Sequence, residues 1–402
     1  MRIHLIVSVG LSLWLAASAP PHPARAESWC AYPLWVHEWG VHVFGADGAP
    51  AAGPALPDHF HTPAKPGAPD ARGPAVRTLP IDSGMRALPV LHFYARAGLS
   101  SPIPLGLEVG FGAGDATAWF PEVDLLRAAA DANGPAALAA RLQLIALRHA
   151  PPATGRAPVP PDPTRQLVWS RLDLTPEPTR APPPTTAAWV ADTRKYPSLW
   201  VNGQRESERF VFYEAKTHER PLIRIQRASD WSPTRRHLAL HNVGTDPVYD
   251  VFFVHREGTQ TFVFYAPSIP AGQSAGLLLD DHAVTARDLT AATTDRLRTA
   301  LVDPTAPQPP KDDRWDMDHC VMGRDPALPF ERAVGHRLYR HEIDTVLAVW
   351  GPRFFAQPGT TVLYREDIAL LDRVMPLSLY TDMYNHIVLR RLGLALWEHV
   401  AW

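Results

Sequence analysis

The sequence predicts a mainly β fold, with immunoglobulin-like β-sandwich blocks followed by a mixed α/β C-terminal region. Residues 236–280 alternate short β-branched and aromatic runs with turn residues, as in HLAL, VYDVFFVH and TFVFYA. The segments HNVGTDPVYDVFF and PAGQS are of a kind familiar in immunoglobulin-type sandwiches. Beyond Asp280 the apolar spacing changes to that of helices, and apolar runs typical of strands return near the C-terminus.

The N-terminal residues 1–26 have the pattern of a cleavable export signal. Arg2 supplies a positive start, residues 5–17 form an apolar run, and Ala24 and Ala26 form a small-x-small cleavage site. This run is shorter than the roughly 20 residues that cross a bilayer as a helix. We therefore expect a mature chain that begins near Glu27, has no transmembrane span, and is periplasmic or secreted.

Length and proline content predict several units. The chain has 402 residues, and a single hydrophobic core usually serves a shorter chain. Many of its 43 prolines lie in four stretches: residues 49–80, 150–164, 175–185 and 302–311. We expect four regions: the signal peptide (1–26), an N-terminal β-rich domain (27–165) with a helical insertion at about 122–149, an immunoglobulin-like sandwich domain (166–282) and the mixed α/β region (283–402).

The charge argues against nucleic-acid binding, and the two cysteines predict a disulfide. Removal of residues 1–26 takes away Arg2 and Arg25 but no acidic residue, so the formal charge changes from −2 to −4. No basic region is present to attract a nucleic acid. Cys30 and Cys320 are the only cysteines of the sequence, and in an oxidising compartment we expect them to form a disulfide. Two separate buried thiols are the alternative.

The first half of the mature chain alternates predicted strands with one helical stretch. Residues 33–45 (PLWVHEWGVHVFG) are rich in Trp and Val and favour a strand. Residues 88–121 contain PVLHFYA and LGLEVGF, and the Ala- and Leu-rich residues 122–149 predict a helical hairpin broken at Asn133-Gly134-Pro135. Strands resume with LVWSRLDL, SERFVFY and PLIRIQ.

The second half contains the clearest strands and two further predicted helices. If Val243 pairs with Val248 across the turn GTDP, the apolar residues of HLAL share a face with those of VYDVFFVH. A helix is expected from about residue 285 to about residue 301, where Thr285 and Asp288 resemble a capping box. Another follows the apolar spacing of residues 330–350 and ends at Gly351-Pro352; the strands TTVLY, MPLSLY and HIVLRRLGLAL complete the chain.

Several segments together resemble an uncharacterised family of secreted bacterial proteins with an N-terminal VHEWGTF-like motif. The segments are, in order, residues 36–40 (VHEWG), PVLHFYA, TAWFP, LVWSRLDLTP, ADTRKYPSLW with SERFVFYEA, and VLAVWGPRFFAQPGTTVLY. The chain departs from the motif where VHEWG continues as Val41-His42. The resemblance implies export and a multi-domain architecture, and it implies no activity and no catalytic residue.

The best local candidate for a metal site is Asp58-His59-Phe60-His61. In an extended segment, alternate residues face the same way about 7 Å apart, and histidines with a carboxylate suit zinc or copper. The identity of a third ligand is not assigned: His37 or His92 could reach His59 and His61 after folding. The alternative is a polar turn in a proline-rich loop, whose histidines bind nothing.

A second spacing, His37-Glu38-x-x-x-His42, fits zinc peptidases only if it lies on a helix. We predict a strand here, and residues five apart on a strand point to opposite faces. Two histidines on opposite faces cannot bind one metal ion. The polar residues of this segment are therefore expected to make structural hydrogen bonds.

No catalytic motif stands out in the sequence, so two functions of different class remain. The first is a non-enzymatic binding or structural protein of the periplasm or cell surface. Its partner would be a carbohydrate or another cell-envelope component, because the chain holds 13 tryptophans that could stack on sugar rings if exposed. The alternative is a metal-dependent hydrolase or oxidase that uses zinc or copper at the histidine cluster.

Overall fold

The computed structural model describes residues 33–46, 53, 55–62, 84–95, 102–111, 114–123, 166–217, 219–232, 235–279, 283–304, 332–381 and 386–402. Within these residues the protein is mainly β, as the sequence predicts. They form three sheets and the helices α3 to α6. The predicted signal peptide, nearly all of the predicted helical insertion, and both Cys30 and Cys320 lie outside the described residues. Their predictions remain predictions.

The described helices and strands follow one another along the chain in this order: β1 (Pro33–Phe44), β2 (Gly84–Tyr94), β3 (Ile103–Gly110), β4 (Gly114–Phe120), β5 (Gln166–Thr175), α3 (Ala188–Thr193), β6 (Trp200–Asn202), β7 (Ser207–Glu208), β8 (Val211–Thr217), β9 (Ile223–Arg227), β10 (His237–Asn242), β11 (Val248–Glu257), β12 (Gln260–Ile269), β13 (Ser274–Leu278), β14 (Ala283–Thr285), α4 (Ala286–Leu301), α5 (Arg340–Phe355), β15 (Gly359–Arg365), α6 (Ile368–Val374), β16 (Leu377–Thr381) and β17 (His386–Trp397).

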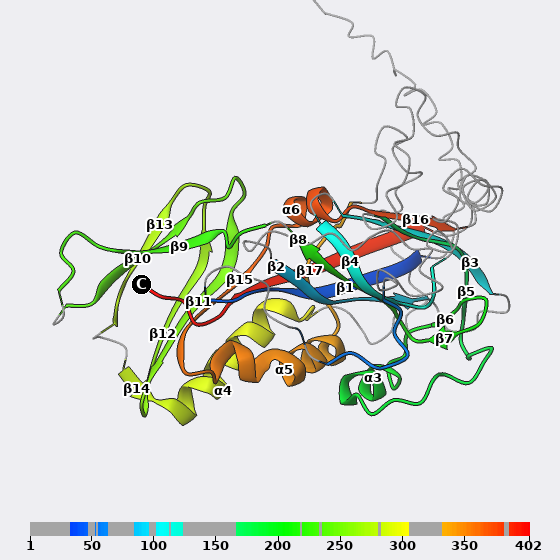
Figure 1. Cartoon of the computed structure of the whole chain (residues 1–402), viewed down its shortest axis with the longest axis horizontal. Helices are drawn as coiled ribbons and strands as arrows, with labels where there is room; N and C mark the ends of the chain where they lie inside the picture. The colour runs from blue at the N-terminus through cyan, green and yellow to red at the C-terminus, as the bar shows by residue number, and fades with distance from the viewer. Residues whose placement is uncertain are drawn as a thin grey trace, which may run out of the picture.

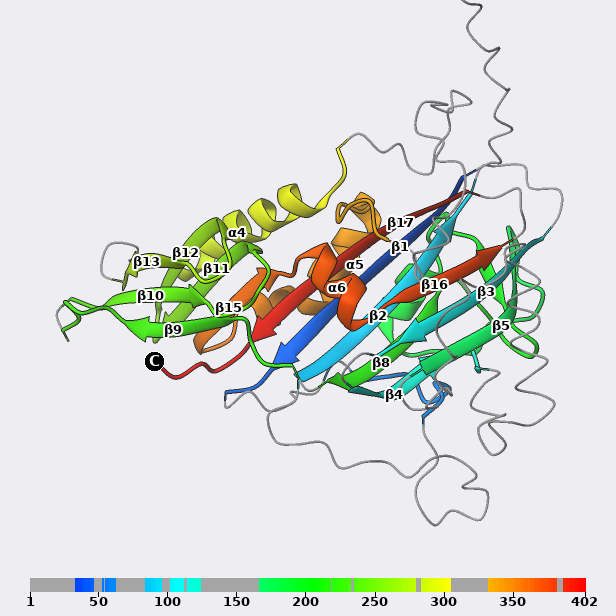
Figure 2. The ribbon, with the colours of Figure 1, turned by 90° about the horizontal axis from the view of Figure 1, so that it is seen from above.

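A central sheet of nine strands runs through the molecule in the order β14-β12-β11-β15-β17-β1-β2-β8-β4. The first and last described strands, β1 and β17, lie side by side near its middle and pair in parallel along their whole length (Figure 2). The other neighbours in this sheet pair antiparallel. The first and the last strand of the described chain therefore meet in the centre of the fold.

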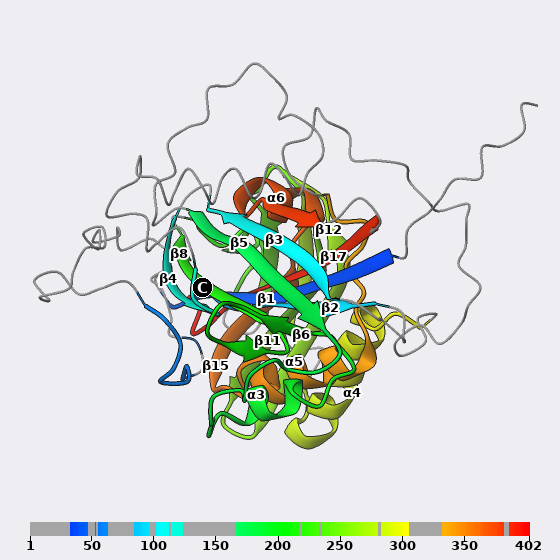
Figure 3. The ribbon, with the colours of Figure 1, turned by 90° about the vertical axis from the view of Figure 1, so that its right-hand side faces the viewer.

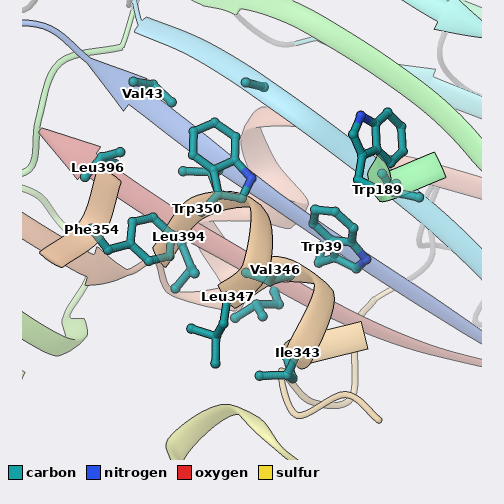
Figure 4. Close-up of a cluster of buried hydrophobic side chains, with 14 of the residues drawn as sticks. Trp39, Val43, Trp189, Ile343, Val346, Leu347, Trp350, Phe354, Leu394 and Leu396 are labelled. Carbon is teal, nitrogen blue, oxygen red and sulfur yellow. The ribbon is translucent and has the colours of Figure 1, made fainter. Parts of the chain in front are cut away.

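One face of the central sheet carries the helices α4 and α5, with α3 beside them (Figure 1). Odd-numbered residues of β1 and even-numbered residues of β17 point to this face. Its apolar core contains Trp39, Val41 and Val43 of β1 and Leu392, Leu394 and Leu396 of β17. Trp39 and Trp350 are fully buried in this core (Figure 4). Amphipathic helices packed on an apolar sheet face account for this layer.

The opposite face is covered by two smaller sheets with α6 between them (Figures 1 and 2). The five-stranded sheet β16-β3-β5-β6-β7 packs on one half and the three-stranded sheet β13-β10-β9 on the other. Each encloses an apolar core of its own against the central sheet. The strip of central sheet between these two cores lies near α6.

The predicted immunoglobulin-like region, residues 166–282, contributes strands to all three sheets. Leu238 and Leu240 do share a core with Val251 and Phe253. The pairing of Val243 with Val248 does not form, because β10 pairs with β9 and β13 while β11 pairs with β12 and β15. The strands β10 and β11 therefore face each other from different layers.

The turn between β10 and β11 explains this change of layer. The Asn242 amide donates to the carbonyl oxygens of Asp246 and Ile269, each at 2.9 Å, and its oxygen accepts from the Gly244 N–H at 2.9 Å. These bonds hold the chain as it crosses from the small sheet to the central one. Strands from all three predicted regions of the mature chain share the central sheet, so the boundaries at 165 and 282 do not separate sheets.

The C-terminal predictions hold with two corrections, both in α5. The helix predicted from about residue 285 to about residue 301 is present as α4, and the three final strands are present as β15, β16 and β17. The helix predicted over residues 330–350 begins only at Arg340, because the described residues 332–339 are not α-helical. The predicted end of α5 at Gly351-Pro352 is wrong, because Pro352 lies inside the helix, which continues to Phe355. Burial of Phe354 and Phe355 in the core offsets the one backbone hydrogen bond that a proline removes. Among the described residues, no helix is both long and apolar enough to cross a membrane.

Candidate functional site

The three histidines predicted as metal ligands have different partners. His37 is fully buried and its Nδ1 lies 2.8 Å from Glu342 Oε2. The His61 Nε2 lies 2.9 Å from Glu206 Oε1, and His59 packs edge-on against Phe120. Burial, with Arg194 nearby, lowers the pKa of His59.

Within the described part of the chain, no group of three His, Cys, Asp or Glu side chains is arranged to hold a metal ion. The site chemistry must therefore be sought in the other polar residues that the fold brings together. Metal binding by His59 and His61 stays a prediction of the sequence.

The polar residues of the VHEWG segment are divided between the two faces of the central sheet. Because β1 is a regular strand, His37 points with Trp39 toward the helices, whereas Glu38 and His42 point to the opposite face. The strand interpretation of this segment is confirmed. Its two histidines contact different groups on opposite faces, so the helical zinc-peptidase arrangement is absent from this segment.

Glu38 forms a buried ion pair with Arg391, its register partner on β17. The Arg391 Nε donates to Glu38 Oε2, and its Nη2 donates to Glu38 Oε1 at 3.1 Å. The Tyr213 hydroxyl donates to the same carboxylate, and the Arg391 Nη1 donates to Asp372 at 3.1 Å. Burial, followed by the neighbouring Glu38 charge, raises the pKa of Tyr213 well above its usual value.

His42 lies on the same face in a second charged group. Its Nδ1 is 3.3 Å from Glu366 Oε1, and its Nε2 is 3.0 Å from the Thr217 hydroxyl. Arg86 donates to Glu366 Oε2 at 2.8 Å and to both oxygens of Glu219, at 2.7 and 2.9 Å. Burial would raise the pKa of Glu366, but the Arg86 charge and the His42 hydrogen bond outweigh it and hold this pKa at about 2.

These two groups form one polar layer, which crosses the central sheet between the two cores of that face. We define the polar layer by Glu38, His42, Arg86, Tyr213, Glu219, Glu366, Asp372 and Arg391. A small cavity between the two groups is lined by Glu38, His42 and Arg86, together with Leu371 and Met375 at α6. It has room for about one water molecule. An organic substrate does not fit there.

Two glycines create the space for this layer. Gly40 and Gly393 are register partners on β1 and β17, and both line the cavity. A Cβ atom at Gly393 would lie 2.7 Å from a methyl carbon of Leu371 and 2.8 Å from Glu366 Oε2. The glycine therefore allows α6 and the Glu366 carboxylate to approach the backbone of β17.

On the helix face, His37 belongs to a buried cluster of imidazole and phenol rings. The Glu342 Oε2 accepts from both His37 Nδ1 and the Tyr339 backbone N–H, each at 2.8 Å. We define the histidine–tyrosine cluster by residues whose rings or carboxylate contact one another: His37, His92, Tyr94, Tyr196, Tyr339, His341 and Glu342. His92 pairs opposite His37 on β2.

Charge in this cluster is concentrated on Glu342. Burial opposes ionisation of Glu342, but the charge and hydrogen bond of His37 hold its pKa at about 2. Burial lowers the pKa of His92 to about 4 and also lowers the pKa of His341. The Glu342 carboxylate therefore shares this cluster with two imidazoles, those of His92 and His341, whose pKa values burial lowers.

Sequence reasoning identified His37, Glu38 and His42 as polar residues of a strand but missed their partners. Glu342, Glu366 and Arg391 come from α5, the end of β15 and β17, which are distant in sequence. One local signal exists, since Arg391 is a charged residue within the apolar run HIVLRRLGLAL. A charge at a buried position of a strand indicates a charged partner.

Comparison of the chain with known protein-family models and with curated proteins finds no match. The functional argument therefore depends on the contacts described above. In both clusters most titratable groups are buried and several are bonded to one another, whereas His37 Nε2, His92 Nε2 and Glu342 Oε1 are buried without a hydrogen-bond partner among the described residues. The titratable groups can hold charge and orient strands, and the cavity beside them admits no more than a small molecule such as water.

Removal of one partner from the Glu38–Arg391 pair should destabilise the protein strongly. Glu38→Gln removes the carboxylate that accepts two of the Arg391 hydrogen bonds and leaves the partly exposed Asp372 as the remaining counter-charge of this buried cation. The loss should cost about 3 kcal/mol of unfolding free energy, the low end for a broken buried pair. The control is Glu257→Gln, because Glu257 is 68% exposed in its pair with Arg236 and should cost less than about 1 kcal/mol. Urea denaturation measures both. An equal loss of unfolding free energy in the two variants would show that the buried pair contributes no more to stability than the exposed pair.

Folding stability should fall as the pH drops from about 6.5 to about 4. Burial lowers the pKa of His92 to about 4, and burial with the Arg365 charge does the same for His336. In this range the two histidines are protonated in the unfolded chain but stay neutral in the folded chain. Proton binding therefore favours unfolding, by up to about 3 kcal/mol for His92. His92→Gln keeps a donor for the Arg209 carbonyl and should flatten the dependence.

This prediction is checked by urea denaturation at several pH values. The variant His336→Gln should also flatten the dependence, and the double variant should do so more than either single variant. A wild-type protein and a double variant with the same loss of stability over this range would contradict the assignment.

Proposed function

We propose that the protein is an exported, non-enzymatic binding or structural protein of the periplasm or cell surface. In this proposal residues 1–26 direct export and are removed, and the chain is a member of the secreted family with the VHEWGTF-like motif. The motif strand then serves to hold the fold together. Binding belongs to the surface of the molecule.

The observation that carries this proposal is the bonding of the motif residues. His37, Glu38 and His42 are each at most 4% exposed. Each is bonded to a charged residue from the last quarter of the chain, namely Glu342, Arg391 and Glu366. Groups that are enclosed and paired in this way cannot reach a substrate, whereas they do join the first strand to the C-terminal elements.

The proposal of an immunoglobulin-like sandwich applies to one end of the molecule, where two sheets pack face to face. There the sheet β13-β10-β9 packs over β11, β12 and β15 around one apolar core. We propose that this end is related to immunoglobulin-like sandwiches, whose loops often carry binding sites. A carbohydrate partner would have to stack on Trp231 or another partly exposed ring, because the following tryptophans are buried: Trp39, Trp119, Trp169, Trp189, Trp200 and Trp350.

The competing proposal, a zinc- or copper-dependent hydrolase or oxidase, predicts a different outcome in one experiment. Natively purified protein is tested for turnover of hydrolase and oxidase substrates and for metal content, beside the variants His59→Gln and His61→Gln, which change the two histidines of the predicted metal site. We expect no turnover, well below one metal ion per chain, and an effect of the variants on stability alone. Turnover that a folded variant loses, or stoichiometric zinc or copper, would overturn the non-enzymatic proposal.

Export is tested by the mass of the mature chain. Expressed with its own N-terminus in a bacterium with two membranes, the protein should appear outside the cytoplasm and begin at Glu27, because signal peptidase requires small residues at Ala24 and Ala26. The control variant Ala24→Leu, Ala26→Leu should keep the uncleaved N-terminus. A cytoplasmic protein that begins at Met1 would contradict export.

A further inference from the structure

Figure 3 shows the end of the molecule where β4, β5 and β6 lie. Residues of these strands and of the loops beside them line a hollow between the central sheet and the five-stranded sheet. Its enclosed part has room for about one water molecule, like the cavity in the polar layer, and the rest of its space opens to solvent. The lining residues come from the end of β4, from β5 and from the β6–β7 turn: Pro121, Glu122, Trp169, Arg171, Leu172, Gly203, Gln204, Arg205 and Glu206. The polar layer and the histidine–tyrosine cluster do not contribute to it.

The backbone places two arginines at this hollow for different reasons. The pairing of β5 with β3 shifts register between Trp169 and Leu172, and such a bulge re-aims the side chains within it. Arg171 lies in this bulge and is exposed. Arg205 lies in the tight turn between β6 and β7, where the Gly203 N–H donates to the Glu206 carbonyl at 2.8 Å.

The acidic residues of the hollow are held by the protein, whereas the arginines are not. Glu206 accepts from His61 Nε2 at 2.9 Å and from the Glu122 backbone N–H at 2.7 Å. These bonds fix the turn against the end of β4. Among the residues that the structure describes, Arg171 and Arg205 have neither a hydrogen bond nor an ion pair. Two guanidinium groups with free donors therefore face one small space.

We propose that this hollow binds the C-terminal carboxylate of a peptide through Arg171 and Arg205. A guanidinium binds a carboxylate through parallel N–H donors, which is the strongest hydrogen-bonding arrangement available to these side chains. The inference rests on the proposed binding function and names the ligand class for it. His61, which the sequence suggested as a metal ligand, acts here by positioning Glu206 and the turn that carries Arg205.

Size and polarity favour a peptide terminus over an acidic sugar. Because the enclosed part of the hollow is this small, only the end group of a ligand, such as a carboxylate, fits against it. Its floor is formed by apolar parts of Pro121, Trp169 and Leu172, which suit a short aliphatic side chain. A sugar ring placed there would lose hydrogen bonds from its hydroxyl groups to water without replacement.

The test is a calorimetric or NMR titration of the full mature chain with N-acetyl-alanyl-alanine and with its C-terminal amide. We expect the acid to bind about tenfold or more tightly than the amide, because only the acid forms hydrogen bonds between charged groups with the arginines, and these are roughly twice as strong as bonds between neutral groups. Arg171→Gln and Arg205→Gln should each weaken binding of the acid about tenfold or more. Glu122→Gln should strengthen it, because a negative charge is removed.

The control variant is Arg224→Gln, an exposed arginine on β9 of the three-stranded sheet, which should leave binding unchanged. Thermal melting checks that Arg171→Gln and Arg205→Gln remain folded, as expected for exposed side chains without partners. Three results would overturn the inference: no binding of the acid at millimolar concentration, equal binding of acid and amide, or equal binding by wild type and both arginine variants.

A fourth result would also overturn it, namely binding of galacturonate in place of the peptide acid, which would make the ligand an acidic carbohydrate. The proposed function and this inference fail separately. Enzymatic turnover would overturn the non-enzymatic function whatever the peptide titration shows. Absence of peptide binding without turnover would remove this ligand class and leave the structural role of the motif residues unchanged.

Discussion

The pairing of β1 with β17 is the constraint on which the rest of this structure depends. It joins residues 353 positions apart, Glu38 and Arg391, and seats both charges at fully enclosed positions. A buried charge without a partner is strongly unfavourable. A shift of one residue would turn Arg391 toward the apolar helix face and leave Glu38 opposite a leucine or another arginine. The ion pair therefore selects one register for the two central strands.

The polar layer also shows how several charges can be buried together. Four carboxylates, on Glu38, Glu219, Glu366 and Asp372, face two guanidiniums and one imidazole. Arginine can bond two carboxylates at once because its donors form a planar fork, and Arg86 does so here. Burial raises the pKa of Asp372, against the opposing effect of the Arg391 charge.

Structural and binding roles are separated in space in our proposal. The central strands carry charges that hold the fold, while the proposed carboxylate site lies where two sheets meet at the surface. The surface site depends on the interior only through His61, whose strand-like contact with Trp119 and bond to Glu206 connect β4 to the β6–β7 turn. This separation allows the ligand-binding residues to change without loss of the central register.

The sequence by itself determined the local features of this protein. Alternation along VHEWG assigned a strand and placed His37 on the face opposite to Glu38 and His42, because side-chain direction in a strand has a period of two. Apolar spacing likewise located α4 and α5. These properties depend on neighbours along the chain.

Only the tertiary structure decided which charges meet. The partners Glu342, Glu366 and Arg391, the placement of β10 and β11 in different layers, and the meeting of Arg171 with Arg205 all follow from the order of strands in the sheets. That order is set by the burial of apolar faces and the pairing of charges across hundreds of residues. No local pattern contains this information, since strands that are neighbours in a sheet can come from opposite ends of the chain.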